Sequence, residues 1–430
     1  MANGARRVRS VLAGRGAARY IWAMSHNALI AEIETWLIGE ALGDPDIVSL
    51  FDALCRRLHG VGVPVERAAL TWPTLHPLFS AEQVFWWLDR GAKLEQYYHS
   101  QAGSEAFRAS PFQFVLTHGL PRLRRRLTGP GALTDFEVLE DFAAQGYTDY
   151  LMTVARFRIA EFAEEEERAT GIMASWATKR DGGFTDADLD ALSRIQTVFA
   201  VACRAAISKR VMTNLANAYL GPTAGWRVLS GDIRRGDGDM IPAVVWFSDL
   251  RGSTRLSDQM AAGDYLALLN RYFECTAAPV IEHGGEILNF IGDGVLGIFP
   301  VDANGGAAGA ARQAAAAARA SLSLCAEAVA AGTPAGAPLE FGIGLDMGEL
   351  MFGNIGVPHR LAFSGIGRVV NGVQRIEKAT KAMGQRVLAT AAVAEAAPDS
   401  WVRAGSHCID DFQHKVELYG LKAAEAKAAE

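Results

Sequence analysis

The sequence has few of the residues that cross-link small secreted domains or hold structural zinc. Five cysteines occur in 430 residues, no two form a CxxC pair, and none of the nine histidines lies in an HExxH motif. A disulfide framework or a zinc site is therefore not expected. Scattered cysteines in odd number favour a reducing compartment, which we take to be the cytoplasm. They are Cys55, Cys203, Cys275, Cys325 and Cys408.

A surplus of positive charge and an uninterrupted apolar segment are also missing. Acidic side chains outnumber basic ones by 48 to 42, which argues against a nucleic-acid partner. The longest apolar stretch, residues 305–332, contains Arg312, Arg319 and Glu327, so we predict an amphipathic helix and no membrane span. The first 31 residues contain no acid. We interpret residues 1–26 as a disordered tail or a mis-assigned start, with Met24 as an alternative start.

The chain is long and apolar enough for at least two cores. In the first part, helical spacing of apolar residues predicts two helices within residues 27–60, the second starting at Pro45. Alternating patterns predict strands at 67–72, 82–88, 150–155 and 171–177. A long helix then runs to about Leu220. This order of elements resembles a GAF domain, a sensor fold, over residues 27–210, and the resemblance implies no particular ligand.

A polar connector over residues 211–240 is predicted to separate this domain from a second one at 241–421, with 422–430 as a tail. Predicted strands and helices alternate in the second domain, at 243–247, 257–283, 286–299, 339–345 and 369–383. The fold class is therefore α/β (α+β).

Two aspartates in the second domain follow apolar strands and are flanked by small residues. Asp249 lies in FSDLRGST (247–254) and Asp293 in FIGDG (290–294). Carboxylates at strand ends can bind Mg²⁺ together with phosphate oxygens, and the small residues let backbone N–H groups approach a phosphate. Either aspartate alone could equally be a turn former or a helix cap.

Together with later segments, these motifs resemble the catalytic domain of class III nucleotidyl cyclases over residues 241–421. The matching segments, in family order, are FSDLRGST, GGEILNFIGDG (284–294), GIGLDMGELMFGNIG (342–356) and RLAFSGIGRVVNGVQR (360–375). The resemblance implies a ferredoxin-like βαββαβ fold. It also implies formation of a 3′,5′-cyclic nucleotide and pyrophosphate from a nucleoside triphosphate.

The resemblance assigns roles to individual residues. Asp249 and Asp293 fall on the ligands of two Mg²⁺ or Mn²⁺ ions, and Asn371 and Arg375 on the pair that positions the ribose and stabilises charge on the α-phosphate. These two pairs come from opposite subunits in the family, so a homodimer is expected. The segment next to the first aspartate supplies candidate phosphate contacts, namely Leu250, Arg251, Gly252, Ser253 and Thr254.

Three positions depart from the family pattern. Asn289 stands where the family has a base-selecting lysine, and Ser364 stands at the second base-selecting position. A phosphate-binding lysine near the C-terminus is replaced by Asp410, with Lys415 five residues later as a substitute.

We therefore predict a cytoplasmic adenylate cyclase that uses ATP and is regulated by an unknown small-molecule or protein signal at its first domain. Asn289 leaves open a cyclase for GTP or a pyrimidine triphosphate, or a degenerate cyclase that binds nucleotide without turning it over. Two interpretations also remain for the helix at 189–220: parallel pairing with a second copy, or packing on its own sheet.

Overall fold

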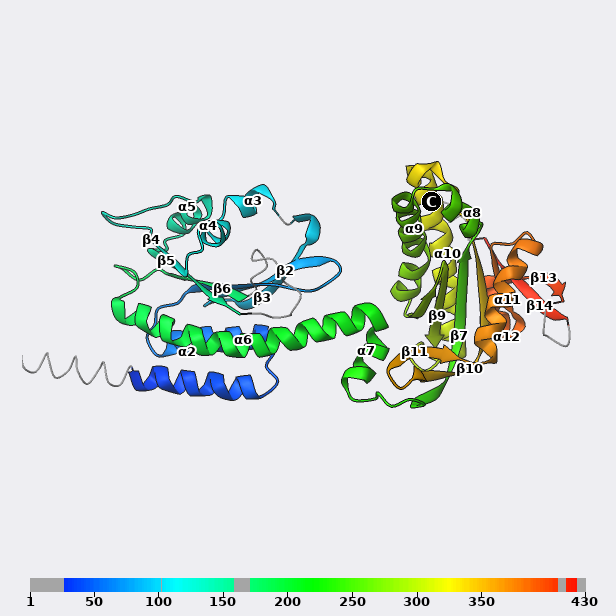
Figure 1. Ribbon diagram of the computed structural model, residues 1–430, viewed down its shortest axis with the longest axis horizontal. Coiled ribbons are helices and arrows are strands. Elements are labelled where there is room, and N and C mark those ends of the chain that lie inside the picture. Colours follow the sequence, from blue (N-terminus) through cyan, green and yellow to red (C-terminus); the bar gives the residue numbers. More distant parts are fainter. Residues whose placement is uncertain (1–26, 102, 158–170, 409–414, 424–430) are drawn as a thin grey trace, which may run out of the picture. The chain divides into compact units, whose positions relative to one another are not determined.

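The structure is a computed structural model that describes residues 27–101, 103–157, 171–408 and 415–423. The predicted tail at 1–26 and Asp410 lie outside these residues. The chain is a mixed α/β protein that divides into two compact units, one ending at Ala218 and the other beginning at Tyr219 (Figure 1). We describe each unit by itself.

The first unit contains a six-stranded antiparallel sheet in the order β3-β2-β1-β6-β5-β4. The strands are β1 (Arg67–Pro73), β2 (Phe79–Trp87), β3 (Gly91–Tyr98), β4 (Arg122–Arg126), β5 (Asp149–Arg156) and β6 (Gly171–Thr178). The four predicted strands are confirmed, whereas the prediction omitted β3 and β4. Strand β4 carries four arginines, and a strand of that composition has no apolar alternation to reveal it.

One face of this sheet is covered by the helix at residues 27–42 together with α2 (Ile47–Gly60) and α6 (Asp186–Leu220). Phe51 of α2 stacks on Phe199 of α6 with ring centroids 5.9 Å apart, within a core where both rings are buried. The N-cap of α2 is Asp46, whose carboxylate accepts from the Ser49 N–H, so the helix does not start at Pro45 as predicted. Short helices complete the unit: η1 (His99–Gln101), α3 (Glu105–Arg108), α4 (Pro111–Thr117) and α5 (Glu137–Ala144).

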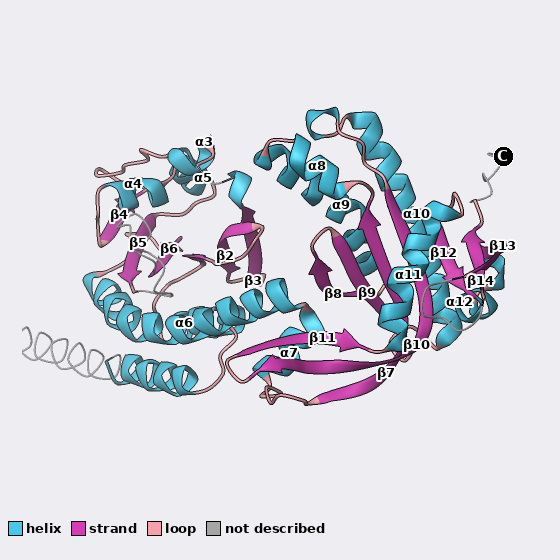
Figure 2. Ribbon diagram, turned by 45° about the vertical axis from the view of Figure 1, so that its right-hand side comes forward, coloured by secondary structure: helices cyan, strands magenta, loops and turns pink. Residues whose placement is uncertain are grey.

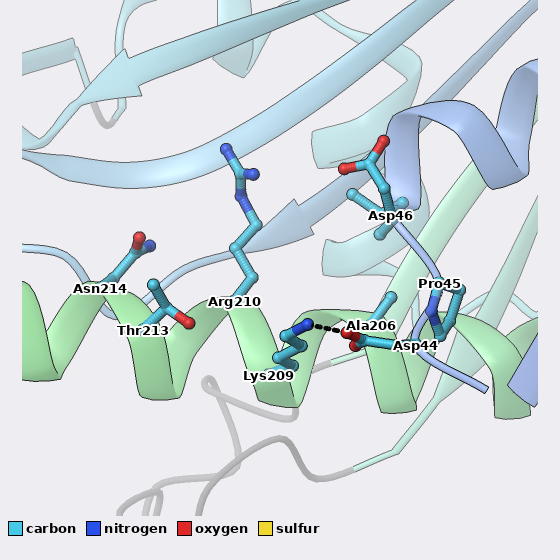
Figure 3. A pocket seen from close by; sticks show the side chains of 9 residues that line it. Asp44, Pro45, Asp46, Ala206, Lys209, Arg210, Thr213 and Asn214 are labelled. Atoms are coloured by element: carbon cyan, nitrogen blue, oxygen red, sulfur yellow. Dashed lines mark hydrogen bonds and ion pairs between the residues drawn. The ribbon is translucent and has the colours of Figure 1, made fainter. Parts of the chain in front are cut away.

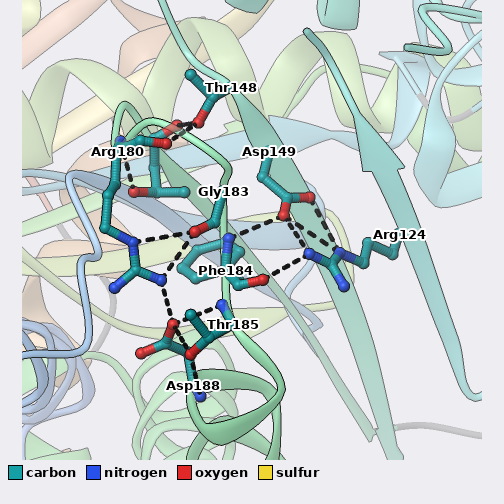
Figure 4. Close-up of polar contacts among 9 residues, drawn as sticks. Arg124, Thr148, Asp149, Arg180, Gly183, Phe184, Thr185 and Asp188 are labelled. Atoms are coloured by element: carbon teal, nitrogen blue, oxygen red, sulfur yellow. Dashed lines mark hydrogen bonds and ion pairs between the residues drawn. The ribbon is translucent and has the colours of Figure 1, made fainter. Parts of the chain in front are cut away.

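Two carboxylates fix the loop that leads into α6 (Figure 4). Asp149 is fully buried, forms a 2.5 Å ion pair with Arg124 and accepts from the Phe184 N–H at 2.9 Å. Asp188 accepts from the Thr185 N–H at 2.6 Å and donates its own N–H to the Thr185 hydroxyl, which is a capping box. The start of α6 is therefore held to the edge of the sheet.

The second unit contains an eight-stranded sheet in the order β13-β14-β12-β10-β7-β9-β8, with β11 paired to β10. Its central strands are β7 (Gly238–Leu250), β8 (Glu286–Ile291), β9 (Gly294–Pro300) and β10 (Phe341–Val357). The others are β11 (Arg360–Ile366), β12 (Val387–Thr390), β13 (Trp401–His407) and β14 (Val416–Leu421). The succession β7, α9, β8, β9, α10, β10 gives the antiparallel order β10-β7-β9-β8, which is the predicted ferredoxin-like arrangement.

Helices cover both faces of this sheet (Figure 2). Helices α9 (Ala262–Glu282) and α10 (Ala307–Ala331) pack on one face, and α11 (Arg368–Ala382) packs on the other. The predicted helix at 257–283 is split into α8 (Ser253–Gln259) and α9. Part of the predicted connector is helical, because α7 (Pro222–Leu229) buries Ala224 in the cluster under α11. The remaining helical segments are η3 (Pro334–Gly336), α12 (Ala391–Ala396) and η4 (Pro398–Ser400).

Helix α10 has the length and mean hydropathy, 1.3, of a membrane-spanning helix. It nevertheless packs as a core helix, since one face of it is lined by fully buried alanines that belong to the core of the second unit. These are Ala310, Ala311, Ala314, Ala315, Ala317 and Ala318. The same composition suits both roles, because alanine favours a helix and permits close packing.

Candidate functional site

The structure brings Asp249 and Asp293 together at one end of the central strands. Asp249 is the penultimate residue of β7 and pairs across to Gly294 on β9, and Asp293 lies in the turn just before that glycine. Asp249 shares its sheet face with Val245 and Phe247, which pack under α11. The two predicted metal ligands are therefore neighbours on adjacent strands.

Burial and the repulsion between two negative charges change the protonation of this pair. Burial, and then the negative charge of Asp293, raise the pKa of Asp249 to about 6. Asp293 Oδ2 is buried and has no hydrogen-bond partner among the described residues. A buried carboxylate oxygen without a donor beside a second carboxylate is an unfavourable arrangement that a divalent cation would relieve. The residues present thus fit the metal ions that the sequence predicts.

The segment after Asp249 is only partly available to a phosphate. Leu250 is buried in the core. The Arg251 side chain donates to the Gln385 carbonyl at 3.0 Å, and the Arg251 backbone N–H donates to the Glu340 carbonyl. Gly252 adopts a left-handed conformation (φ 75°) and caps α8, whose first turn contains Ser253 and Thr254. The first N–H groups of a helix have no intrahelical acceptor. Gly252, Ser253 and Thr254 are therefore better placed for a phosphate than Leu250 or Arg251.

Helix α11 carries the other predicted catalytic pair on the face turned away from the sheet. Glu377 lies over Gly342, the residue that pairs with Asp249. With 3.6 residues per turn, Arg375 and Asn371 project about 160° and 120° away from Glu377. Asn371 is exposed and Arg375 half-buried, whereas Glu377 is 6% exposed. A single chain therefore does not direct Asn371 and Arg375 at its own aspartates.

The two predicted base-selecting residues, Asn289 and Ser364, lie on strands β8 and β11, which contact each other. Asn289 is exposed on the edge strand β8 and pairs with Leu296. Ser364 on β11 pairs with Gly353, which in turn pairs with Gly238 at the far end of β7. Strand β11 also contacts β8, since a Cβ on Gly365, next to Ser364, would lie 2.7 Å from Leu288, next to Asn289. The structure therefore brings Ser364 and Asn289 to neighbouring strands.

Lys415 also lies apart from the aspartates. It is exposed and directly precedes β14. Leu418 of β14 pairs with Thr390, the last residue of β12, so Lys415 lies beyond that end of the strand. Asp249, by contrast, is level with the first residues of β10.

Glu377 is the residue at this site that the sequence analysis missed. Burial, and then the charge of Asp249, raise its pKa to about 7. Gly342 and Gly344 leave room for it, since a Cβ on Gly342 would collide with Glu377 Oε1. The signal was present in the sequence, because Val370, Val373 and Glu377 follow helical spacing and a lone acid on an apolar face is unusual.

The first unit has a pocket of its own, of about 230 Å³, between the start of α2 and α6 (Figure 3). Lys209 forms an ion pair with Asp44, and Arg210 donates to Glu82 at 2.6 and 2.8 Å. Both cations of the pocket are already paired, so it indicates no ligand class. The lining residues are Asp44, Pro45, Asp46, Ile47, Ala206, Lys209, Arg210, Thr213 and Asn214.

Comparison with known proteins identifies the second unit. Residues 240–409 match the model of the adenylate and guanylate cyclase catalytic domain. An uncharacterised protein of Mycobacterium tuberculosis is 32% identical over 158 residues, 37% of this chain and 28% of that protein. An adenylate cyclase of Anabaena cylindrica is 31% identical over 152 residues, 35% of this chain and 30% of that protein. The crystal structure of the guanylyl cyclase Cya2 is 30% identical, with a TM-score of 0.38, and covers 43% of this chain and 93% of that one.

Residues 240–409 are thus a class III adenylate/guanylate cyclase catalytic domain, and a nucleoside triphosphate is the substrate that such a domain implies. The matched segment begins at residue 240 and leaves the first unit outside it. The chain spans less than a third of the length of these curated relatives.

Proposed function

We propose that this protein is an adenylate cyclase that converts ATP to 3′,5′-cyclic AMP and pyrophosphate. The observation that carries the proposal is the pair of adjacent carboxylates, Asp249 and Asp293, of which Asp293 Oδ2 is buried without a partner. Beside them, the N–H groups at the start of α8, which have no acceptor within the helix, can donate to phosphate oxygens. This arrangement suits a metal-bound triphosphate.

Asp249 and Asp293 would hold two Mg²⁺ or Mn²⁺ ions. When bound, these ions supply charge neutralisation of the triphosphate and lower the pKa of the ribose 3′-hydroxyl. In the reaction the 3′-hydroxyl gives its proton to a water or to the triphosphate and its oxygen forms a bond to the α-phosphorus, while the bond from that phosphorus to the bridging oxygen breaks to release pyrophosphate. Asn371 hydrogen-bonds the ribose and Arg375 donates to the oxygens of the α-phosphate, where charge develops.

Adenine is the favoured base because neither base-selecting position carries the Glu and Cys that guanylate cyclases tend to have. Asn289 and Ser364 each offer both a donor and an acceptor to a purine edge. A side chain with both capacities discriminates less than a lysine would. GTP or a pyrimidine triphosphate is therefore the second candidate substrate.

The active form would be a homodimer. One chain carries both the metal-binding aspartates and the Asn371/Arg375 pair, but it does not direct them at the same site. The aspartates lie at one end of the central strands, while Asn371 and Arg375 lie on the face of α11 that is turned away from the sheet. Strands β8, β10 and β11 also expose large apolar side chains that a second copy would cover. They are Phe290, Ile291, Met351, Ile355, Val357 and Ile366.

We assign the first unit a regulatory, GAF-like role, and we place the protein in the cytoplasm. The support is its separate core, its antiparallel sheet and the exit of its chain through α6 directly into the cyclase unit. A small molecule or a protein could act on it, and the pocket at Lys209 and Arg210 touches the exit helix.

The test is an assay of the full chain with Mn²⁺ and each of the four nucleoside triphosphates, measuring pyrophosphate and cyclic nucleotide. We expect cyclic AMP from the parent, and no product from Asp249→Ala or Arg375→Ala alone. An equimolar mixture of the two variants should recover part of the activity, because a mixed dimer contains one intact site. No product with any triphosphate, despite nucleotide binding, would leave the regulatory nucleotide-binding module as the answer.

A further inference from the structure

Lys378 of α11 is a cation without a partner near the two aspartates. It is exposed, and it forms no ion pair or hydrogen bond with any described residue. Arg251, another cation beside the site, is already engaged, since its side chain donates to the Gln385 carbonyl at 3.0 Å and to the Thr380 hydroxyl at 3.4 Å. The ammonium group of Lys378 is therefore available to a ligand.

The last turns of α11 lie over the end of the sheet that carries the aspartates. Glu377 and Thr380 both lie over Gly342, which pairs with Asp249 on β7. Lys378 stands between these two residues in the sequence, and its Cα lies within about 3 Å of both along the helix axis. Lys378 is therefore level with the metal-binding end of the central strands.

Helical geometry gives the side of α11 on which Lys378 lies. Glu377 faces the sheet, and from it Lys378 projects at about 100° and Ile376 at about 260° around the helix, so the two flank opposite sides. Ile376 belongs to the buried cluster over β12 and β14. In the sheet these strands lie on one side of β10, whereas β7 and β9 lie on the other. Lys378 therefore lies toward β7 and β9, whose ends the two aspartates occupy.

The electrostatics of the site agree with this placement. Burial raises the pKa of Asp249 and of Glu377, and the positive charge of Lys378 acts in the opposite direction on both carboxyl groups. A charge that reaches Asp249 also reaches an anion bound beside Asp249. The compact ammonium group of a lysine, on its flexible four-carbon stem, is a common phosphate binder.

We propose that Lys378 binds the triphosphate held at Asp249 and Asp293 of its own chain. Because the α-phosphate is assigned to Arg375, Lys378 would contact the two outer phosphates. This proposal rests on the proposed function. Helix α11 would then serve two sites, with Lys378 at the aspartates of its own chain, and Asn371 and Arg375 at those of a second copy.

Binding without turnover tests the contact in the full chain. Two probes are titrated by calorimetry with Mg²⁺: 3′-deoxy-ATP, which lacks the attacking hydroxyl, and inorganic pyrophosphate, which corresponds to the outer phosphates. We expect Lys378→Gln to weaken both about tenfold and to raise the KM for ATP by a similar factor. Lys378→Arg keeps the charge and should bind within about threefold of the parent.

Arg312→Gln is the matched control, because it removes an exposed positive charge from α10, on the other face of the sheet. It should bind both probes as the parent does. Unchanged affinity in Lys378→Gln, or an equal loss in Arg312→Gln, would overturn the proposal. A parent chain that binds both probes but forms no cyclic nucleotide removes the proposed function alone, whereas a parent that binds neither removes both.

Mixed dimers test whether Lys378 serves the aspartates of its own chain. Lys378→Gln mixed with Arg375→Ala contains one site with Asp249 and Lys378 from one chain and Arg375 from the other, so turnover with the parental KM should reappear. Mixed with Asp249→Ala, the site that keeps Asp249 lacks Lys378 in the same chain, so the raised KM should persist. The reverse pattern would place Lys378 at the site of the second copy and would overturn the proposal.

Discussion

Glu377 occupies the space above Gly342 that the Cβ of any other residue would fill. Gly342 pairs with Asp249, so this packing brings a third carboxyl group within reach of the charge of Asp249, which adds to burial in raising the pKa of Glu377. The close approach of α11 to β10 therefore determines the electrostatics of the site as well as the fold of the second unit.

Replacing Gly342 by Ala should displace Glu377 and the adjoining turn of α11. We expect the second unit to lose about 1–3 kcal/mol of stability through overpacking, together with most cyclase activity. Gly348→Ala on the same strand is the control, because its Cβ would meet Val369 at an ordinary 3.4 Å. Hydrogen exchange of the β10 and α11 amides in the full chain measures the difference. Equal effects of the two substitutions would contradict this account.

Replacing Glu377 by Gln should stabilise the second unit at high pH only. The pKa of Glu377 is raised to about 7, so the folded chain holds a proton that the unfolded chain releases near its ordinary pKa. Stability contributed by this residue is therefore present at about pH 5 and lost as the pH rises through about 7. Glu377→Gln should gain on the order of 2 kcal/mol at about pH 8 and almost nothing at about pH 5. Hydrogen exchange of the β10 and α11 amides measures this gain in stability, and a gain that does not depend on pH would contradict the prediction.

Binding of Mn²⁺ should weaken as the pH falls through about 6, where Asp249 takes up a proton. The carboxylate is the form that binds a cation, so affinity should fall about tenfold for each pH unit below that value. Titration calorimetry between about pH 5 and 8 measures this. Asp249→Asn should bind weakly throughout, while Asp258→Asn, which removes an exposed acid on α8, should follow the parent. Constant affinity over this range would count against Asp249 as a ligand.

In the first unit, Gly183→Ala should be far more damaging than Gly182→Ala. Both glycines have positive φ, 73° and 79°, which costs other residues about 1–2 kcal/mol. A Cβ on Gly183 would in addition collide with the buried carboxylate of Asp149, whereas Gly182 has open space around it. We expect losses of about 3 kcal/mol or more against about 1 kcal/mol, read from exchange of the β5 and β6 amides. Similar losses for both would mean that Asp149 can move.

Substitution of Asn289 by Lys should sharpen the choice of base. A lysine only donates, so it suits the N1 acceptor of adenine and not the N1–H of guanine. We expect the ratio of ATP to GTP turnover to rise about tenfold, equivalent to about 1.4 kcal/mol. Gln313→Lys adds the same charge at an exposed position of α10 and should leave the ratio unchanged. An unaltered ratio in Asn289→Lys would separate Asn289 from base selection.

The sequence alone determined the cyclase unit, because its chemistry lies in short motifs. A carboxylate after an apolar strand, as in the segment around Asp249, needs only local structure to be recognised. Helical and strand periodicity also predicted most elements, since a buried face repeats along the chain. Periodicity failed for β4, whose arginines lie on both faces: Arg124 forms an ion pair with the buried Asp149 and Arg125 one with Asp135, so no apolar face repeats.

Tertiary structure decided which of these residues meet. The register of β7 and β9 brings Asp249 next to Asp293, and the contact of β11 with β8 brings Ser364 to a strand beside that of Asn289. Packing of α11 placed Glu377 at the site, and packing of α6 on its own sheet buried Phe199 and left Val201 exposed. These relations depend on contacts between segments far apart in the chain, which no local pattern of residues encodes.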